Sequence, residues 1–498
     1  MVMHQHELIE GYVLEIISRS RSVQSRCKNL LSRDFASQAP RNLAKVLIDI
    51  CNYLENASKY IFLSIDWENK IIQKIEESLN LLKTTDFIVR DLGSHIRYID
   101  GAQTQKLPWS FIRPIERMVK DFLPETEIML RPQWKYNYTI MTTNLYDVYH
   151  YYLSRYFNYV DGKNPEEILV PLGKSFYIIS FPSIERNNIL LHCLIGHEIG
   201  HLVLKKYFTE KRSQELLQSI RDRVAAIVQK NIEKSIKDII PDIPPPPLFV
   251  HSLTQQMIQA QIKRTMEIWQ RGLEEILSDI IGSFLFGPAI LFSTLEIALQ
   301  DLDGLDKVPN ENNNYYPPWR MRLRNIFEVV KDLKLLPLPH DKFIEKKIVN
   351  SVGKRFTLIE EIVGGKSDKE GIENEEILKI AYEEIEKDIP QAKTFYTNEL
   401  EKLIVKSNDF YDHLPPLIER IDFGIPPNAC EKSIHNRKLS TIVEIINSAW
   451  FHKLAWDDNL FDPQGAFNNK VLEKRSRMNR LTLKALEYSD IEIDYINK

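Results

Sequence analysis

The sequence predicts an α+β protein that is predominantly α-helical, and three observations support this class. Apolar residues recur at helical spacing near both ends of the chain, as in "NLAKVLIDICNYLENASKYIFL". Short stretches rich in aromatic and β-branched residues, which are typical of strands, occur at 127–140, 167–173 and 175–181. The length of 498 residues exceeds what one ordinary core holds. We therefore expect a helical N-terminal region (1–104), a mixed core (105–340) and a helical C-terminal region (341–498).

The composition indicates a globular protein and argues against nucleic-acid binding. Hydrophobic residues make up 43% of the chain and charged residues 27%, a balance that allows a large core. The 65 basic and 69 acidic residues give a net charge of −4, so no overall positive field attracts nucleic acid. Apolar residues punctuate the basic run at 470–484, which is typical of a solvated helix face. The 4 cysteines form no C-x-x-C pair, and this usage fits a reducing, cytoplasmic compartment.

Neither a secretory leader nor a membrane span is expected. The first residues lack a basic segment followed by an apolar segment and a cleavage site. The best candidate for a span, 280–299, is uncharged only from 280 to 295, which is shorter than the ~20 residues that a span needs. Gly287 and Pro288 also interrupt it. This segment is therefore expected to form a buried helix with a kink.

The helices of the mixed core follow the strand-like stretches. A helix is predicted over 185–207, with Ser183 as its N-cap. A second helix covers 213–240 and ends at a proline-rich connector, 241–250, where four consecutive prolines force an extended backbone. A long helix begins at about 251 and carries "EEILSDIIGSF".

His197, Glu198 and His201 form an H-E-x-x-H pattern inside the apolar run "LLHCLIGHEIGHLVLKKYF". At ~100° per residue, two histidines four apart on a helix differ by only about 40°, so both imidazoles can bind one metal ion. Glu198 lies on the adjacent flank, where it can act as general base toward a water molecule and then as general acid. Zinc suits such ligands because it remains four-coordinate with one position open.

The alternative is a chance match to a short pattern in an amphipathic helix. Two histidines and a glutamate in an apolar run are costly to bury unless something pairs with them, which favours a metal site with Zn²⁺ as its cofactor. Gly200, inside the pattern, permits the close approach of another backbone or of the metal's other ligand.

A carboxylate on the later helix is the expected third ligand. Glu275 and Asp279 are four apart in "LEEILSDIIG", so one can bind the metal while the other accepts the N–H of a liganding histidine. The isoleucines and leucine around them indicate a buried helix rather than an acidic surface. Glu274 is the competing ligand, but Ser278 rather than an aspartate follows it by four residues. Glu275 is therefore preferred as the ligand and Asp279 as the support of a histidine.

H-E-x-x-H followed on a later helix by E-x-x-x-D resembles the gluzincin zinc metallopeptidases. Within them, the chain is most similar to the branch that contains the CAAX prenyl endopeptidases and the bacterial heat-shock membrane endopeptidases. That branch has a His-Pro-Pro-like turn and an arginine after the third ligand. Here Pro317, Pro318 and Arg322 match, and Tyr316 stands where histidine is usual. The resemblance covers residues 165–330.

The resemblance implies a zincin-like core, made of a small sheet, the HExxH helix and the third-ligand helix, that hydrolyses peptide bonds. It also implies an edge strand that pairs with the substrate backbone, for which 174–180 is the candidate. Tyr315, Tyr316 and Arg322 are candidate hydrogen-bond donors to an oxyanion. Arg322 is alternatively a structural ion-pair partner.

Together these features predict a zinc endopeptidase that acts on a protein or peptide substrate, with Glu198 as general base. Two alternatives stay open. One is a catalytically silent interaction or scaffold protein, in which zinc only ties helices together; a fourth protein ligand would favour it. The other is a regulated cytosolic stress or defence protease that the terminal helical regions hold inactive.

Overall fold

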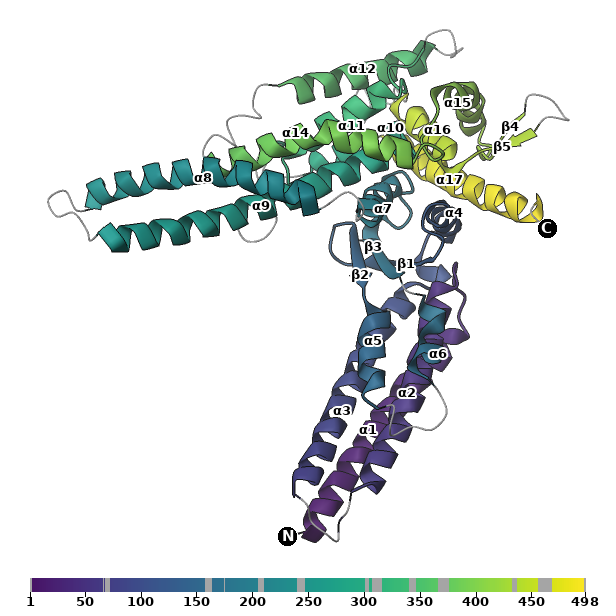
Figure 1. The fold of residues 1–498 in the computed structure, drawn as a ribbon. Coiled ribbons are helices and arrows are strands. Elements are labelled where there is room, and N and C mark those ends of the chain that lie inside the picture. The colour runs from purple at the N-terminus through teal and green to yellow at the C-terminus, as the bar shows by residue number, and fades with distance from the viewer. Residues whose placement is uncertain are drawn as a thin grey trace. The chain divides into compact units, whose positions relative to one another are not determined.

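Two compact units make up the chain, one of residues 1–187 with 493–498 and the other of 188–492. Helices predominate and the sheet is small, which confirms the mostly helical α+β class (Figure 1). The division falls between Asn187 and Asn188, so it coincides with neither of the boundaries expected at 104/105 and 340/341. The computed structural model describes residues 2–65, 67, 72–156, 164–173, 175–204, 210–239, 247–300, 304–306, 316–339, 346–365, 376–431, 437–455 and 468–496.

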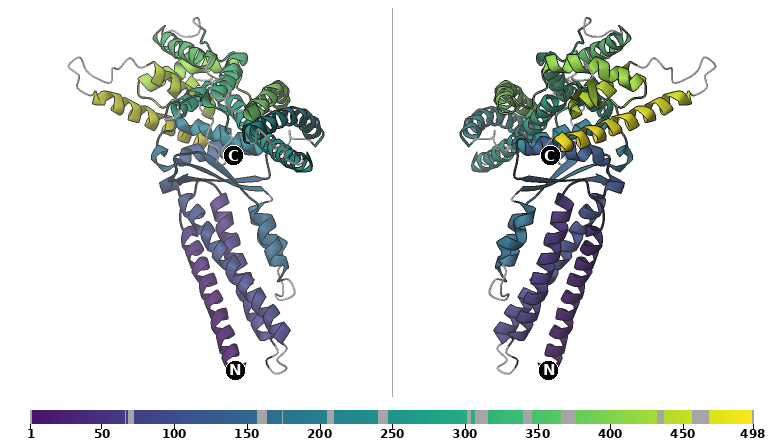
Figure 2. Two further views of the ribbon diagram at one scale, coloured as in Figure 1. Left: turned by 90° about the vertical axis from the view of Figure 1, so that its left-hand side faces the viewer. Right: turned by 90° about the vertical axis from the view of Figure 1, so that its right-hand side faces the viewer.

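Three long helices begin the first unit, as the apolar spacing predicts: α1 (Val2–Leu31), α2 (Ala39–Leu63) and α3 (Ile72–Gly101). α1 packs against both of the others, and Figure 2 shows the three side by side. Leu47 and Leu54 of α2 are fully buried because they lie on one face of the helix. The short η1 (Thr104–Lys106), α4 (Trp109–Lys120) and α5 (Leu145–Ser154) belong to the same unit.

The sheet of the first unit has the strand order β1–β3–β2, with β1 at Thr126–Gln133, β2 at Thr139–Thr143 and β3 at Ser175–Pro182. β1 pairs with β3 in parallel and β2 pairs with it antiparallel. The expectation of an edge strand at 174–180 is therefore wrong for its described residues, because β3 is hydrogen-bonded on both sides. Its almost continuous burial is typical of a central strand.

The stretch 167–173 was expected to be a strand, but it is helical. It contains the end of α6 (Pro165–Leu169) and the 3-10 turn η3 (Val170–Leu172). The side chain of Asn164 accepts a hydrogen bond from the backbone N–H of Glu166 at 3.2 Å and caps the first turn. Pro165 stands at the first helical position, where its missing N–H costs nothing. These local signals outweigh the β-branched residues of the stretch.

The HExxH residues lie on α7 (Ile195–Val203), which is shorter than the helix predicted over 185–207. Before it the chain forms two 3-10 elements, η4 (Ser183–Glu185) and η5 (Leu191–Leu194), separated by turns on either side of Asn188. Asparagine favours turns, and a short apolar run does not distinguish a 3-10 turn from an α-helix.

Ser183 is not the N-cap that the sequence predicts. It lies within η4, where Pro182 occupies the N-cap position and no side chain caps the turn. The assignment fails because the helix itself begins at Ile195, well after this serine.

The next three helices after α7 are α8 (Glu210–Ile239), α9 (Pro247–Phe286) and α10 (Pro288–Ala298). The connector predicted over 241–250 is too long, because α9 already begins at Pro247; proline is tolerated in a first helical turn. Residues 241–246 lie outside the described chain.

The segment 280–299 is buried almost throughout, as predicted. Gly287, with φ of +59°, breaks it into α9 and α10, so it forms two helices rather than one kinked helix. No helix in the described part of the chain is apolar over a length that could cross a membrane.

The remaining elements are α11 (Trp319–Asp332), α12 (Lys346–Gly364), α14 (Glu376–Glu399), α15 (Ser407–Asp422), β4 (Ala429–Glu431), β5 (Arg437–Leu439), α16 (Ile442–Leu454) and α17 (Asn469–Ile496). α9 is the central helix of the second unit and packs against α7, α8, α11 and α14. The hairpin formed by β4 and β5 was not predicted.

Candidate metal centre

α7 and α9 approach closely because small residues face each other where they meet. A Cβ atom on Gly200 would lie 2.6 Å from the Cα of Ser278, and one on Gly196 would lie 3.3 Å from the Cα of Gly282. The first distance leaves no space for a side chain. The close backbone approach expected at Gly200 is therefore confirmed, and it brings the side chains of α9 within reach of the histidines on α7.

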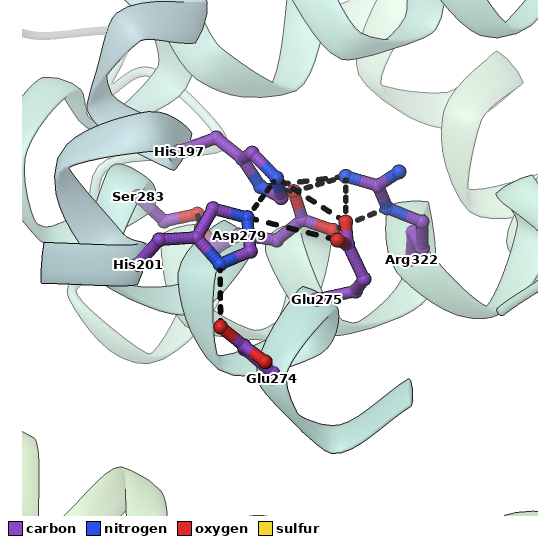
Figure 3. Close-up of polar contacts among 7 residues, drawn as sticks. All are labelled: His197, His201, Glu274, Glu275, Asp279, Ser283 and Arg322. Carbon is purple, nitrogen blue, oxygen red and sulfur yellow. Dashed lines mark hydrogen bonds and ion pairs between the residues drawn. The ribbon is translucent and has the colours of Figure 1, made fainter. Parts of the chain in front are cut away.

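His197 and His201 of α7 turn toward Glu275 of α9 (Figure 3). Their Nε2 atoms are 3.1 Å apart. Glu275 Oε2 lies 3.2 Å from His197 Nε2, and Glu275 Oε1 lies 3.6 Å from His201 Nε2. One ligand atom from each of the three residues lies within 4.8 Å of the others. The group could therefore bind a single metal ion.

The opposite nitrogen of each imidazole faces a different carboxylate of α9. His197 Nδ1 lies 2.7 Å from Asp279 Oδ1, the support that the sequence predicts. His201 Nδ1 lies 3.2 Å from Glu274 Oε1. Glu274, the competing candidate for third ligand, is therefore on the far side of the imidazole from the Nε2 atoms that converge with Glu275.

Neighbouring charges shift the pKa values of the buried residues His197 and Asp279 in opposite directions. Burial would lower the pKa of His197, but Asp279 and Glu275 outweigh it and raise this pKa to about 10. Burial would raise the pKa of Asp279, yet Arg322 and His197 hold it well below the ordinary value. Asp279 is therefore ionised and able to accept hydrogen bonds at neutral pH.

Arg322, from α11, is an ion-pair partner of Asp279, one of the two roles that the sequence left open. Its Nε donates to Asp279 Oδ2 at 2.7 Å and its Nη2 to Oδ1 at 2.9 Å. Nη2 also lies 3.7 Å from Glu275 Oε2, and the guanidinium lies over the ring of Trp319 at 4.7 Å. Because Nε and Nη2 of Arg322 both donate to Asp279, this arginine fixes the carboxylate that contacts His197.

Glu198 is buried beside the three candidate ligands. Burial raises the pKa of its carboxyl group, while His197 and His201 partly lower it. A carboxyl group with a raised pKa is better matched to proton transfer near neutral pH than an ordinary glutamate. Glu198 thus has the environment of a general base.

Tyr316 borders the site where solvent reaches it, and the residue as a whole is 37% exposed. The hydroxyl of Tyr382 donates to the Tyr316 carbonyl at 3.3 Å, which holds this part of the chain against α14. Burial raises the pKa of the Tyr316 phenol, and Glu275 and Glu198 raise it further. The phenol is therefore protonated at neutral pH and can donate a hydrogen bond. Tyr315 lies outside the described residues.

The residues fit a divalent cation. Glu275 Oε2 is buried and lies 3.2 Å from His197 Nε2, yet it accepts no hydrogen bond, which is unusual for a carboxylate oxygen unless an ion or water satisfies it. Two imidazoles and one carboxylate are a donor set that zinc accepts, with a fourth position left open.

No protein-family model, curated protein or solved structure matches this chain. The resemblance to gluzincin peptidases thus stays a prediction from short motifs.

The sequence-based prediction missed the contact between Glu274 and His201. It expected a close approach at Gly200, but it did not identify the small residues of α9 that meet α7 there. A signal for the second was present, since Gly196 and Gly200 form G-x-x-x-G while Ser278 and Gly282 form S-x-x-x-G. Small residues four apart lie on one helix face and allow two backbones to approach.

Proposed function

We propose that this chain is a zinc-dependent endopeptidase. His197, His201 and Glu275 would hold the zinc ion. Zinc bound there would supply an acidified water and a Lewis acid for a peptide carbonyl. The observation that carries the proposal is the buried Glu198, which lies beside the cluster with a raised pKa and is available for proton transfer.

The protein's own groups would divide the remaining work. Glu198 would accept a proton from the attacking water and then deliver it to the leaving nitrogen. Tyr316 would donate a hydrogen bond to the oxyanion that develops on the carbonyl oxygen. Arg322 would act indirectly, by holding Asp279 against His197.

The donor count favours this proposal over a silent zinc-containing scaffold. Structural zinc sites take four protein ligands, whereas catalytic sites take three and keep one position open. Among the described residues, the metal-capable group consists of His197, His201 and Glu275, and Asp279 and Glu274 contact the nitrogens that face away from it. This arrangement supports an open position for water and substrate.

The test compares wild type with Glu198→Gln in two measurements, zinc content by mass spectrometry and digestion of a peptide library. We expect both proteins to hold zinc and the variant to lose hydrolysis by roughly 10²–10⁴-fold. Glu267→Gln is the matched control, because Glu267 is an exposed carboxylate on the same helix as Glu275. Full activity in Glu198→Gln, or no cleavage by zinc-loaded wild type, would overturn the proposal.

A further inference from the structure

Each imidazole nitrogen of the site faces a carboxylate of α9. For His197, Nδ1 lies 2.7 Å from Asp279 and Nε2 lies 3.2 Å from Glu275. For His201, Nε2 lies 3.6 Å from Glu275 and Nδ1 lies 3.2 Å from Glu274. The fourth of these contacts is the one to which neither the motif nor the proposed chemistry assigns a role.

Helix geometry explains why Glu274 differs from the other two carboxylates. Glu275 and Asp279 are separated by about 40° around the helix, so they share one face, whereas Glu274 lies about 100° from Glu275. The side chain of Asp279 is accordingly 2% exposed and that of Glu274 is 38% exposed. Glu274 therefore contacts the histidine from the solvent-facing rim of the site.

The two histidines are held to different degrees. His197 is enclosed, and its partner Asp279 is itself fixed by two hydrogen bonds from Arg322. His201 is more exposed, with 16% of its side chain accessible against 10% for His197. Since packing fixes His201 less tightly, its orientation depends more on what its Nδ1 contacts.

We propose that Glu274 is a positioning residue that prepares His201 to bind metal, an inference that rests on the proposed zinc site. A neutral imidazole carries one proton, and the nitrogen that bears it cannot bind a cation. By accepting a hydrogen bond from Nδ1–H, Glu274 keeps the proton there. The lone pair of Nε2 then faces Glu275 and His197.

Glu274 cannot act as a ligand itself in this arrangement. Its Oε1 contacts Nδ1 of His201, while the ligand atoms converge on Nε2 across the ring. If the contact between Glu274 and His201 were only a surface ion pair, it would contribute little to stability. The positioning role, by contrast, predicts a loss in metal affinity, because partners of liganding histidines typically change affinity or activity by about 10–100-fold.

The experiment measures zinc affinity by competition with a chromophoric chelator, and the visible absorption spectrum after loading with Co²⁺. It compares wild type with Glu274→Ala and Glu274→Gln. We expect the alanine variant to bind zinc about 10-fold more weakly, at the low end of that range because Glu274 is partly exposed, and to shift the Co²⁺ bands. Glutamine retains an acceptor oxygen, so it should restore most of the affinity.

Glu267→Ala is the matched control. Glu267 is an exposed glutamate two turns before Glu274 on the same face of α9, about 10 Å away along the axis, and its substitution should leave the zinc affinity unchanged. Circular dichroism of the metal-free proteins verifies that the variants fold. Wild-type affinity and spectrum in Glu274→Ala, or an equal loss in the Glu267 control, would overturn the inference.

The outcomes separate this inference from the proposed function. Affinity and spectrum are measured without substrate, so normal zinc binding that weakens in Glu274→Ala supports the positioning role even if no peptide is cleaved. If wild type binds neither zinc nor Co²⁺, both proposals fail together. If the wild type cleaves peptides but Glu274→Ala retains full zinc affinity, only the positioning role fails.

Discussion

Arg322 holds Asp279 through two hydrogen bonds, at 2.7 Å from Nε and 2.9 Å from Nη2, and Asp279 in turn lies 2.7 Å from His197 Nδ1. The side chain of Arg322 is 10% exposed and that of Asp279 is 2% exposed. A buried carboxylate thus joins a cation from α11 to a histidine of α7, and its charge is compensated on both sides.

Replacing Arg322 with alanine should destabilise the protein strongly. The substitution leaves Asp279 buried with its main counter-charge removed, a change that typically costs about 3–5 kcal/mol. Denaturant unfolding of the metal-free protein measures the effect. Lys331→Ala is the control, since the Lys331–Glu360 pair is 55% and 52% exposed and should contribute at most about 1 kcal/mol. Equal losses of unfolding free energy in the two variants would contradict the view that Arg322 and Asp279 form a buried ion pair whose charges depend on each other.

Gly200→Ala should separate α7 from α9. The added methyl group would lie 2.6 Å from the Cα of Ser278, so the backbones must move, at a cost of about 1–3 kcal/mol. Zinc affinity should fall as well, because the candidate ligands come from both helices. Gly353→Ala in α12 provides the contrast: a Cβ there meets nothing within 4 Å, and the change should stabilise by roughly 0.5–1 kcal/mol. Denaturant unfolding of both variants measures their stability, and titration with a chelator measures their zinc affinity.

Removing the metal should lower the thermal unfolding midpoint, and adding zinc should restore it. A ligand that binds only the folded protein stabilises it by about 2.7 kcal/mol at a hundred-fold excess over its dissociation constant. His201→Ala should abolish this response, whereas Glu198→Gln should preserve it, because Glu198 is not among the three candidate ligands. Calorimetry with and without a chelator provides the measurement. If zinc did not change the thermal unfolding midpoint of the wild type, the metal centre would be contradicted.

The first unit should lose stability as the solution becomes acidic, partly through His95. Burial lowers the pKa of His95, although Asp91 opposes this, and its Nδ1 lies 3.0 Å from the Tyr149 hydroxyl. The unfolded chain, with a pKa of about 6.5, then binds more protons, so the contribution is present above that pH and is lost below it.

The loss that His95 adds is limited to about 1.4 kcal/mol per pH unit below about pH 6.5. Thermal midpoints of wild type and His95→Gln, compared at about pH 7.5 and about pH 5.5, isolate this contribution. The wild type should lose more than the variant. The same substitution at His150, whose side chain is 40% exposed, is the control.

Tyr316→Phe should slow hydrolysis without displacing the metal. The phenol is protonated, so the substitution would delete the hydrogen bond that we propose it donates to the oxyanion, a change that lowers kcat by about 10²–10³ in comparable sites. KM and zinc content should change little, because Tyr316 is not part of the three-residue metal group. Steady-state kinetics on a peptide substrate tests this, and a loss confined to KM would assign the tyrosine to binding instead.

The sequence predicts the parts of the site that depend on spacing within one helix. His197 and His201 are four apart, as are Glu275 and Asp279, and all four lie where that periodicity suggests. The contact of Glu274 with His201 could not be predicted in the same way. It depends on the crossing of two helices and on which rotamer a partly exposed glutamate adopts.

The errors in the fold have a similar origin. The order β1–β3–β2 depends on strands pairing across long separations, so a local reading of 174–180 could not tell an edge strand from a central one. Likewise, the β-branched residues of 167–173 favour a strand, but an asparagine cap followed by a proline starts a helix there. In both cases, non-local pairing or capping outweighs intrinsic preference.

The small residues between α7 and α9 provide a criterion for searching other sequences. Five-residue HExxH matches arise by chance in many helices, and the two histidines and the glutamate alone do not separate a chance match from a folded site. In this chain Gly196 directly precedes the pattern and Gly200 lies within it, and Ser278 and Gly282 have the same spacing on the helix that carries Asp279. A search that requires both pairs of small residues would select sequences in which a second helix can approach the HExxH helix closely enough to supply the third ligand.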